Sequence, residues 1–135
     1  MTRRVSSVRH VQHHAQHVRW DELALEKITE MVSRKVIAGR RHTFSQIWLK
    51  RGALAARHVH DGEQSAYVLD GALRVQVSDP AAPEAPMNEV IVRAGEVIVI
   101  PAGAPHQVEA LDDALVIRIL VTASDVPPSP EPPAR

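Results

Sequence analysis

Two short stretches of this chain concentrate side chains that can bind a metal ion. In the first, His58 and His60 are separated by one residue, and Gln64 follows after an Asp-Gly pair. Residues two apart on a β-strand point to the same side, so both imidazoles can converge on one point, and Gln64 can return to it if the chain turns. In the second stretch, a Pro/Gly-rich turn after an apolar run projects a single histidine, His106.

This set of donors defines the chemistry to expect. Three imidazoles and one amide oxygen suit a borderline divalent ion such as Mn, Fe, Co, Ni, Cu or Zn. Four protein ligands leave a position open for water or substrate when the ion takes five or six ligands. Because the donors are neutral, the charge of the ion stays uncompensated, which favours an anionic or enolic ligand or a lower pKa of bound water. Taken singly, each stretch is also consistent with exposed histidines on a polar strand or turn.

The elements that must position these residues are short β-strands. A strand is expected over 43–49, apolar and polar residues alternate over 73–77, and Asp70-Gly71 between two apolar runs predicts a hairpin turn. Seven or eight short strands with little helix predict an antiparallel sandwich or barrel that can enclose one small ligand or metal site. Further strands are expected at 67–69, 90–92, 97–100, 108–110 and 115–121, with a loop over 78–88.

The two ends differ from the middle. Residues 21–32 have helix-forming composition and predict a short helix or turn. Five prolines within 126–135 predict a tail that cannot pair in a sheet. We therefore expect an N-terminal arm over 1–35, a β-barrel domain over 36–125 and a Pro-rich, disordered tail. The arm carries histidines at spacings that would share a metal-binding helix face, although a solvated terminus is the simpler interpretation; they are His10, His13, His14 and His17.

Composition narrows the possible partners. The chain has 135 residues, with 16 Lys+Arg against 16 Asp+Glu, so it lacks the basic excess of a nucleic-acid-binding domain. No apolar run is long enough to span a bilayer, and no secretory leader is evident. There are no cysteines, which excludes disulfides and thiolate metal sites. We expect a cytoplasmic protein with a small-molecule ligand and with neither a nucleic-acid nor a membrane partner.

In this order and spacing, the two stretches resemble the cupin superfamily. Its first motif is Gly, five residues, His-x-His, three or four residues, Glu, six residues and Gly. Its second is Gly, five residues, Pro-x-Gly, two residues, His, three residues and Asn. Here Gln64 stands where Glu is usual and Ala110 where Asn is usual. The other motif positions match, at Gly52, His58, His60, Gly71, Gly95, Pro101, Gly103 and His106.

The resemblance implies a double-stranded β-helix, or jelly-roll, barrel that commonly forms homodimers. It also implies a metal inside one end of the barrel, held here by His58, His60, Gln64 and His106. The chain looks most similar to small cupins of the pectin-degradation type, which promote ring opening or ketonisation of unsaturated uronates. Where that group places a catalytic aspartate on the last strand, this chain has Arg118. A guanidinium stays protonated and cannot act as a base, so we do not carry that reaction over.

Two further residues are candidates for substrate binding. Arg118 interrupts the apolar run 115–121 and shares a side with Val116 and Leu120. If that side lines the barrel, Arg118 can hold a carboxylate bidentately; if it faces solvent or a subunit interface, the arginine pairs with an acid instead. The Tyr67 hydroxyl is the second candidate, with core or rim packing as its alternative. Glu63, beside Gln64, should point away from the metal by alternation.

The sequence thus predicts a cupin that binds one divalent transition metal ion: Mn, Fe, Ni, Zn or Co. The favoured function is isomerase- or lyase-type Lewis-acid chemistry on a small carboxylate, sugar acid or enolisable carbonyl. One alternative is an Fe-dependent cupin dioxygenase, and another is a non-catalytic module that binds or senses a small molecule. A metal-free barrel that serves structure alone fits the intact ligand set least.

Overall fold

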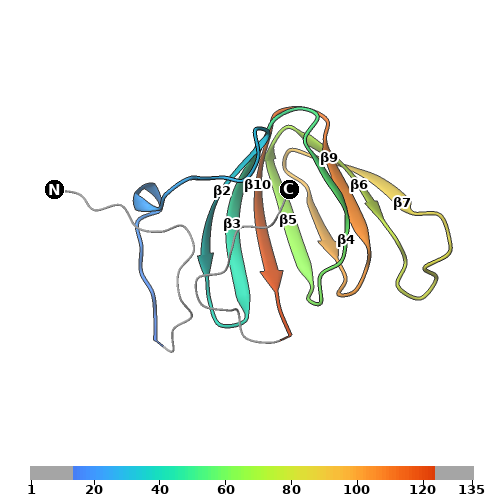
Figure 1. Ribbon diagram of the computed structural model, residues 1–135, viewed down its shortest axis with the longest axis horizontal. Coiled ribbons are helices and arrows are strands. Elements are labelled where there is room, and N and C mark those ends of the chain that lie inside the picture. Colours follow the sequence, from blue (N-terminus) through green and yellow to red (C-terminus); the bar gives the residue numbers. More distant parts are fainter. Residues whose placement is uncertain (1–13, 124–135) are drawn as a thin grey trace.

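The structure, a computed structural model, describes residues 14–123, and β-strands are the main regular structure in this part (Figure 1). Within these residues the single helical element is a 3-10 turn, η1 (Trp20–Glu22). None of the described helical structure is long and apolar enough to cross a lipid bilayer. The predicted all-β class is therefore confirmed.

The strands form two antiparallel sheets that stand side by side in Figure 1. One sheet has six strands in the order β1-β2-β3-β10-β5-β8, and the other has four in the order β4-β9-β6-β7. The strands in chain order are β1 (Glu26–Lys27), β2 (Val32–Ala38), β3 (His42–Leu49), β4 (Leu54–His58), β5 (Gln64–Asp70), β6 (Ala72–Val77), β7 (Asn88–Arg93), β8 (Val97–Ile100), β9 (His106–Ala110) and β10 (Ala114–Val121).

The core lies between the two sheets and follows the alternation of the sequence. On β6, Leu73 and Val75 are buried, while Arg74 between them is half-buried on the other side. The predicted hairpin joins β5 to β6 at Gly71, whose φ of 82° favours glycine, and a Cβ there would overlap the backbone of Asp113. The buried core cluster comprises Ala53, Ala66, Val68, Leu73, Val75, Val92, Ile100, Ala104, Ala110, Ala114 and Val116.

The N-terminal part differs from the sequence-based expectation. Only η1 is helical within the range 21–32, and β1 and β2 already belong to the six-stranded sheet before residue 36. The sequence of β2 does not show the alternation of a strand, because the charged residue Arg34 lies on the same side as buried Val36. Arg34 forms an ion pair with Glu26 of β1 at 3.1 Å. His14 and His17 lie in an exposed, non-helical segment, whereas His10, His13 and the expected tail fall outside the described residues.

Candidate metal centre

Three histidines from the two sequence stretches meet at one end of the small sheet. His58 is the last residue of β4 and His106 is the first of β9, and the two are direct partners in the β4–β9 ladder. Their ring centroids are 4.2 Å apart, and the ring of His60 lies 4.9 Å from His58 and 5.6 Å from His106. One ring nitrogen from each histidine lies within 4.8 Å of the other two. The expected convergence of the three imidazoles is therefore present.

Backbone carbonyls orient two of the rings. His58 Nδ1 lies 2.8 Å from the carbonyl oxygen of Ala56, and His106 Nδ1 lies 2.9 Å from that of Ala104. A carbonyl oxygen only accepts hydrogen bonds, so Nδ1 carries the proton in both rings and Nε2 keeps its lone pair. This is the tautomer in which an imidazole binds a metal through Nε2.

A backbone hydrogen bond connects the turn before His106 to the first histidine stretch. The amide of Gly103 donates to the carbonyl oxygen of His60 at 2.9 Å, and the φ of Gly103 is 77°, which favours glycine. On the other side of the turn, the amide of Ser78 donates to the carbonyl oxygen of Pro105 at 2.8 Å. These bonds explain how a Pro/Gly-rich loop holds His106 in place with only 1% of its surface exposed.

Gln64 lies at the start of β5 with its side chain buried, 6% exposed, and with Oε1 lacking any hydrogen-bond partner. Its neighbour Glu63 is exposed, as the alternation predicts. His60 Nε2 and His106 Nε2 are likewise buried without a partner. Because unpartnered buried polar atoms are rare and unfavourable, these three orphaned acceptors fit a cation that would satisfy them together. Coordination by Gln64 remains a prediction.

Burial favours the neutral form of two of the histidines. Burial, together with the nearby His58, Arg118 and His106, lowers the pKa of His60 to about 4. Burial also lowers the pKa of His106, with smaller contributions from His58 and Arg118. Since only the neutral imidazole donates a lone pair to a metal, both rings are ready to bind one at neutral pH.

Arg118 lies on the interior side of β10. It is opposite Ser45 on β3 and Ala66 on β5, and both of these side chains are buried. Arg118 Nε is itself buried without a hydrogen-bond partner, and so is Ser45 Oγ. Burial, with the nearby charge of Arg34, lowers the pKa of Arg118 to about 10, so it stays protonated at neutral pH. Of the two orientations that the sequence allowed, the structure has the one that faces the barrel.

Tyr67 lies apart from these residues. It is 42% exposed and pairs with Ile117 and Val97, on the side of β5 opposite to buried Gln64 and Ala66. The structure therefore does not bring its hydroxyl together with the three imidazoles.

Arg34 is a second charged side chain on the interior side of the sheet, and the sequence analysis did not identify it. Its position there is accompanied by an ion pair with Glu26, which the sequence pattern does not reveal.

The sequence profile of the family described as "Cupin domain" matches residues 47–122, which is more than half of the chain. The chain therefore belongs to the cupin family, and the resemblance noted in its two motifs is confirmed. Among curated proteins, none matches the sequence.

Solved structures agree with this fold. KdgF from Halomonas sp. superposes with a TM-score of 0.68 and 22% identity, covering 80% of this chain and 94% of that chain. An RmlC-like cupin from Shewanella frigidimarina gives 0.69 and 19%, covering 82% and 93%. Oxalate decarboxylase of Bacillus subtilis gives 0.67 and 18%, covering 81% of this chain but 31% of that chain. At these identities the likeness establishes the β-barrel fold of the cupins.

Proposed function

We propose that this protein is a mononuclear divalent-metal cupin that acts on a small carboxylate, a sugar acid or an enolisable carbonyl. The observation that carries the proposal is the convergence of three imidazole nitrogens within 4.8 Å, two of them from rings whose Nε2 atoms are buried and unpartnered. His58, His60 and His106 would hold the ion, with the amide oxygen of Gln64 as fourth ligand.

The donor set is compatible with Mn, Fe, Ni, Zn or Co, because nitrogen and oxygen ligands alone do not select among these ions. Support for manganese comes from one structural neighbour, since oxalate decarboxylase is described with Mn(II) centres. When bound, such an ion supplies Lewis-acid polarisation of a substrate oxygen. We propose isomerase- or lyase-type chemistry on this basis.

The chain's own residues would bind and orient the substrate. Arg118 offers a buried, protonated guanidinium whose Nε has no partner, and a carboxylate is the ligand that its donors match best. Ser45 Oγ, directly across the β3–β10 ladder, would donate a further hydrogen bond to the same group. A substrate that carries a carboxylate would thus relieve two unsatisfied donors at once.

The buried polar residues among the described part of the chain are Ser45, Gln64, Ser78 and His106, and none is a carboxyl. Proton transfer would therefore fall to bound water or to a rim group such as Asp61, whose charge acts on His60. The described residues thus include no buried carboxylate that could act as a general base. This favours one second candidate, an Fe-dependent dioxygenase, whose reaction does not require a protein carboxylate to remove a proton from the substrate carbon. A non-catalytic sensor would use the same residues for binding alone.

Elemental analysis of protein purified without added metal tests the proposal. We expect close to one divalent ion per chain in the native protein and a much lower content in His106→Gln. Mn, Ni or Zn supports the isomerase or lyase assignment, and Fe supports the dioxygenase. Incubation with uronates and other carboxylates, with product detection and oxygen uptake, then separates enzyme from binder. Protein that neither carries a stoichiometric ion nor melts higher with added Mn, Ni, Zn, Co or ferrous salts would overturn the proposal.

We also propose that the chain works as a homodimer, in line with the habit of its family, so that its macromolecular partner is a second copy.

A further inference from the structure

A second arginine, Arg34 of β2, shares the interior of the barrel with Arg118. Its side chain is only 12% exposed and lies on the same side of β2 as buried Val36. Val36 is the ladder partner of Ser45 on β3, and Ser45 is the ladder partner of Arg118 on β10. After burial, the charge of Arg34 is the next cause of the lowered pKa of Arg118. The two guanidiniums are therefore neighbours on one interior face, with Ser45 on the strand between them.

Both guanidiniums keep N–H donors that the protein does not use. Glu26 of β1 accepts a hydrogen bond from Arg34 Nε at 3.1 Å, and within residues 14–123 the side chain of Arg34 has no second hydrogen-bond partner. An arginine has five N–H donors, so its two terminal nitrogens are left for a ligand. Arg118 Nε and Ser45 Oγ are buried without a partner. Three neighbouring strands thus direct unused donors into the same interior.

The charges of these residues do not balance. Glu26 is the one carboxylate paired with either arginine, and none of the buried polar residues within 14–123 is a carboxyl. The described interior therefore has an excess of positive charge, and a divalent ion held by neutral imidazoles would increase it. Because uncompensated buried charge is unfavourable, a ligand with two negative charges fits this interior better than a ligand with one.

The strand register leaves space for a short ligand between the two guanidiniums. The residues beside Arg118 in its two ladders, Ser45 and Ala66, both have small side chains. Two strand spacings and two residues along the strand separate Arg34 from Arg118, which places their Cα atoms about 12 Å apart. Since both side chains are long, a ligand with a few carbon atoms between its two acidic groups can reach both.

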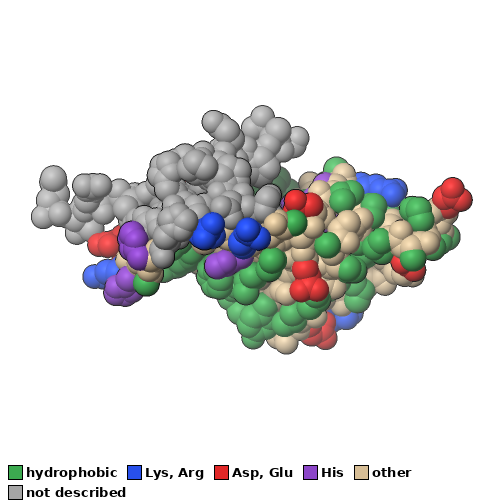
Figure 2. All heavy atoms as spheres, turned by 90° about the horizontal axis from the view of Figure 1, so that it is seen from below, with side chains coloured by type: hydrophobic (Ala, Val, Ile, Leu, Met, Phe, Trp, Pro, Cys, Tyr) green, Lys and Arg blue, Asp and Glu red, His purple; other side chains and the backbone are tan. Residues whose placement is uncertain are grey.

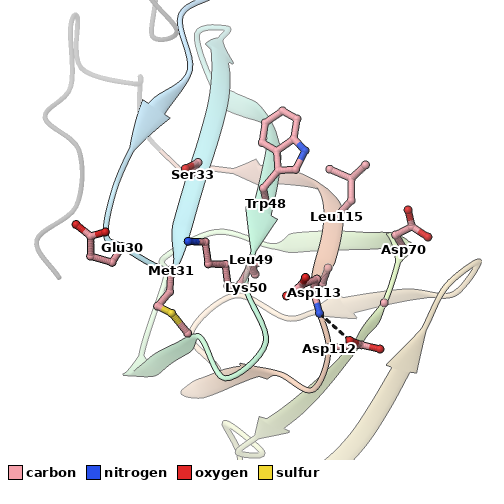
Figure 3. A pocket seen from close by; sticks show the side chains of 12 residues that line it. Glu30, Met31, Ser33, Trp48, Leu49, Lys50, Asp70, Asp112, Asp113 and Leu115 are labelled. Carbon is pink, nitrogen blue, oxygen red and sulfur yellow. Dashed lines mark hydrogen bonds between the residues drawn. The ribbon is translucent and has the colours of Figure 1, made fainter.

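The outside of the described molecule offers no comparable site for an anion. A pocket of about 550 Å³ lies on the other side of the same sheet, where the ladder partners Ser33 and Trp48 line it (Figure 3). In the view of Figure 2, the acidic and basic side chains of the described residues form small separate groups rather than one extended basic area. The charged residues around the pocket are mainly acidic and would repel an anion: Glu30, Lys50, Asp70, Asp112 and Asp113.

We propose that Arg34 is the second arginine of the acid-binding site and that the ligand of this site is a short dicarboxylate, with one carboxylate against each guanidinium. Ser45 Oγ would donate to the carboxylate held by Arg118, and Glu26 would hold Arg34 in place through its Nε. The inference rests on the proposed function and adds the charge of the substrate. It makes Arg34 a specificity-determining residue, because a ligand with one carboxylate leaves one guanidinium unpaired.

Calorimetry on the full chain loaded with manganese tests the proposal, with malonate, succinate and glutarate compared against their monomethyl esters. We expect the best diacid to bind more than about tenfold tighter than its ester, the effect of one hydrogen-bonded charge, and Arg34→Gln to reduce this ratio below about threefold. Arg74→Gln is the matched control, since it also removes the arginine of an Arg–Glu pair, with Glu109 at 3.0 Å, but on the outer face of the other sheet. The same titration on metal-free protein excludes chelation by the ion as the cause.

Two further variants separate a role in binding from a role in the fold. Arg34→Lys keeps the charge and should keep most of the preference for the diacid. Glu26→Gln removes the negative charge beside Arg34 and should increase the preference, opposite to Arg34→Gln. A pair that only supports β1 and β2 would instead lose binding in the same direction in both variants. Thermal melting of each variant shows whether it is folded.

The outcomes distinguish this inference from the proposed function. If no diacid binds more tightly than its ester, the dicarboxylate is wrong, while carboxylate binding that Arg118→Ala weakens would leave the proposed function intact. A preference that persists in Arg34→Gln overturns the role of Arg34. A native chain that carries no stoichiometric ion, yet prefers the diacid through Arg34, supports this inference and overturns the metal proposal alone.

Discussion

His58 lies directly opposite His106 in the β4–β9 ladder, with ring centroids 4.2 Å apart, although the two residues belong to distant motifs of the sequence. The register of one strand pair therefore brings the two motifs together. His60 joins them through the hydrogen bond from the Gly103 amide to its carbonyl oxygen. Each of the predictions below tests one part of this arrangement.

The first prediction concerns the buried histidine. His106→Gln removes an Nε2 that is buried and has no other partner, so metal affinity should fall more than about a hundredfold, beyond the loss typical of a supporting residue. Titration of metal-free protein with Mn, Ni or Zn, followed by calorimetry, measures it. His17→Gln, an exposed histidine outside the cluster, should bind metal as the native chain does. Equal affinity in the two variants would exclude His106 as a ligand.

The second prediction concerns Gln64. Gln64→Glu keeps an oxygen donor and adds a negative charge next to the cation, so metal binding should persist or tighten. Gln64→Leu keeps the volume but removes the donor, so affinity should fall roughly tenfold or more. The ratio of the two affinities, from the same titration, is the measurement. If the leucine variant binds as tightly as the glutamate variant, the amide oxygen is not a ligand.

The third prediction concerns Arg118. Arg118→Ala should weaken the binding of a small carboxylate to the metal-loaded protein by roughly tenfold to a hundredfold, the range for hydrogen bonds to a charged group. Metal content should be unchanged, and the variant should melt higher without ligand, because a buried guanidinium whose Nε has no hydrogen-bond partner opposes folding. Calorimetry with oxalate and acetate, against Arg93→Ala as the exposed control, makes the comparison. Unchanged carboxylate binding would remove Arg118 from the site.

The fourth prediction is a pH dependence of the metal-free protein. Burial lowers the pKa of His60 from 6.5 to about 4, so between these values the unfolded chain binds a proton that the folded chain does not. The stability that comes with neutral His60 is therefore complete above pH 6.5 and is lost as the pH falls toward about 4. Thermal melts across this range measure it, and His60→Gln should flatten the profile. A profile that is the same with and without His60 would contradict the assigned cause.

The sequence was sufficient to predict the β-barrel and the convergence of the three histidines, because period-two alternation and motif spacing are local patterns that the strand register preserves. It was insufficient for β2, where Arg34 interrupts the apolar pattern yet faces inward through its pair with Glu26. For the last strand, alternation placed Arg118 and Val116 on one side without saying which side is the interior. Tyr67 shows the same limit, since its exposed position follows only from the pairing of β5 with β10 and β8.

The last prediction concerns Gly62, in the turn that leads from His60 to Gln64. A Cβ at this position would overlap the carbonyl oxygen of Val121, and Val121 is held there because its amide donates to the carbonyl oxygen of Glu63 at 2.9 Å. Gly62→Ala must therefore push the turn away from β10, which should lower stability by about 1 to 3 kcal/mol and displace Gln64, with a loss of metal affinity. Gly95→Ala is the control, because its φ of 89° strains alanine while nothing lies within 4 Å of the added Cβ. Chemical denaturation and metal titration of both variants should show destabilisation in each but weaker metal binding only in Gly62→Ala; native affinity in that variant would show that the turn does not position the ligand.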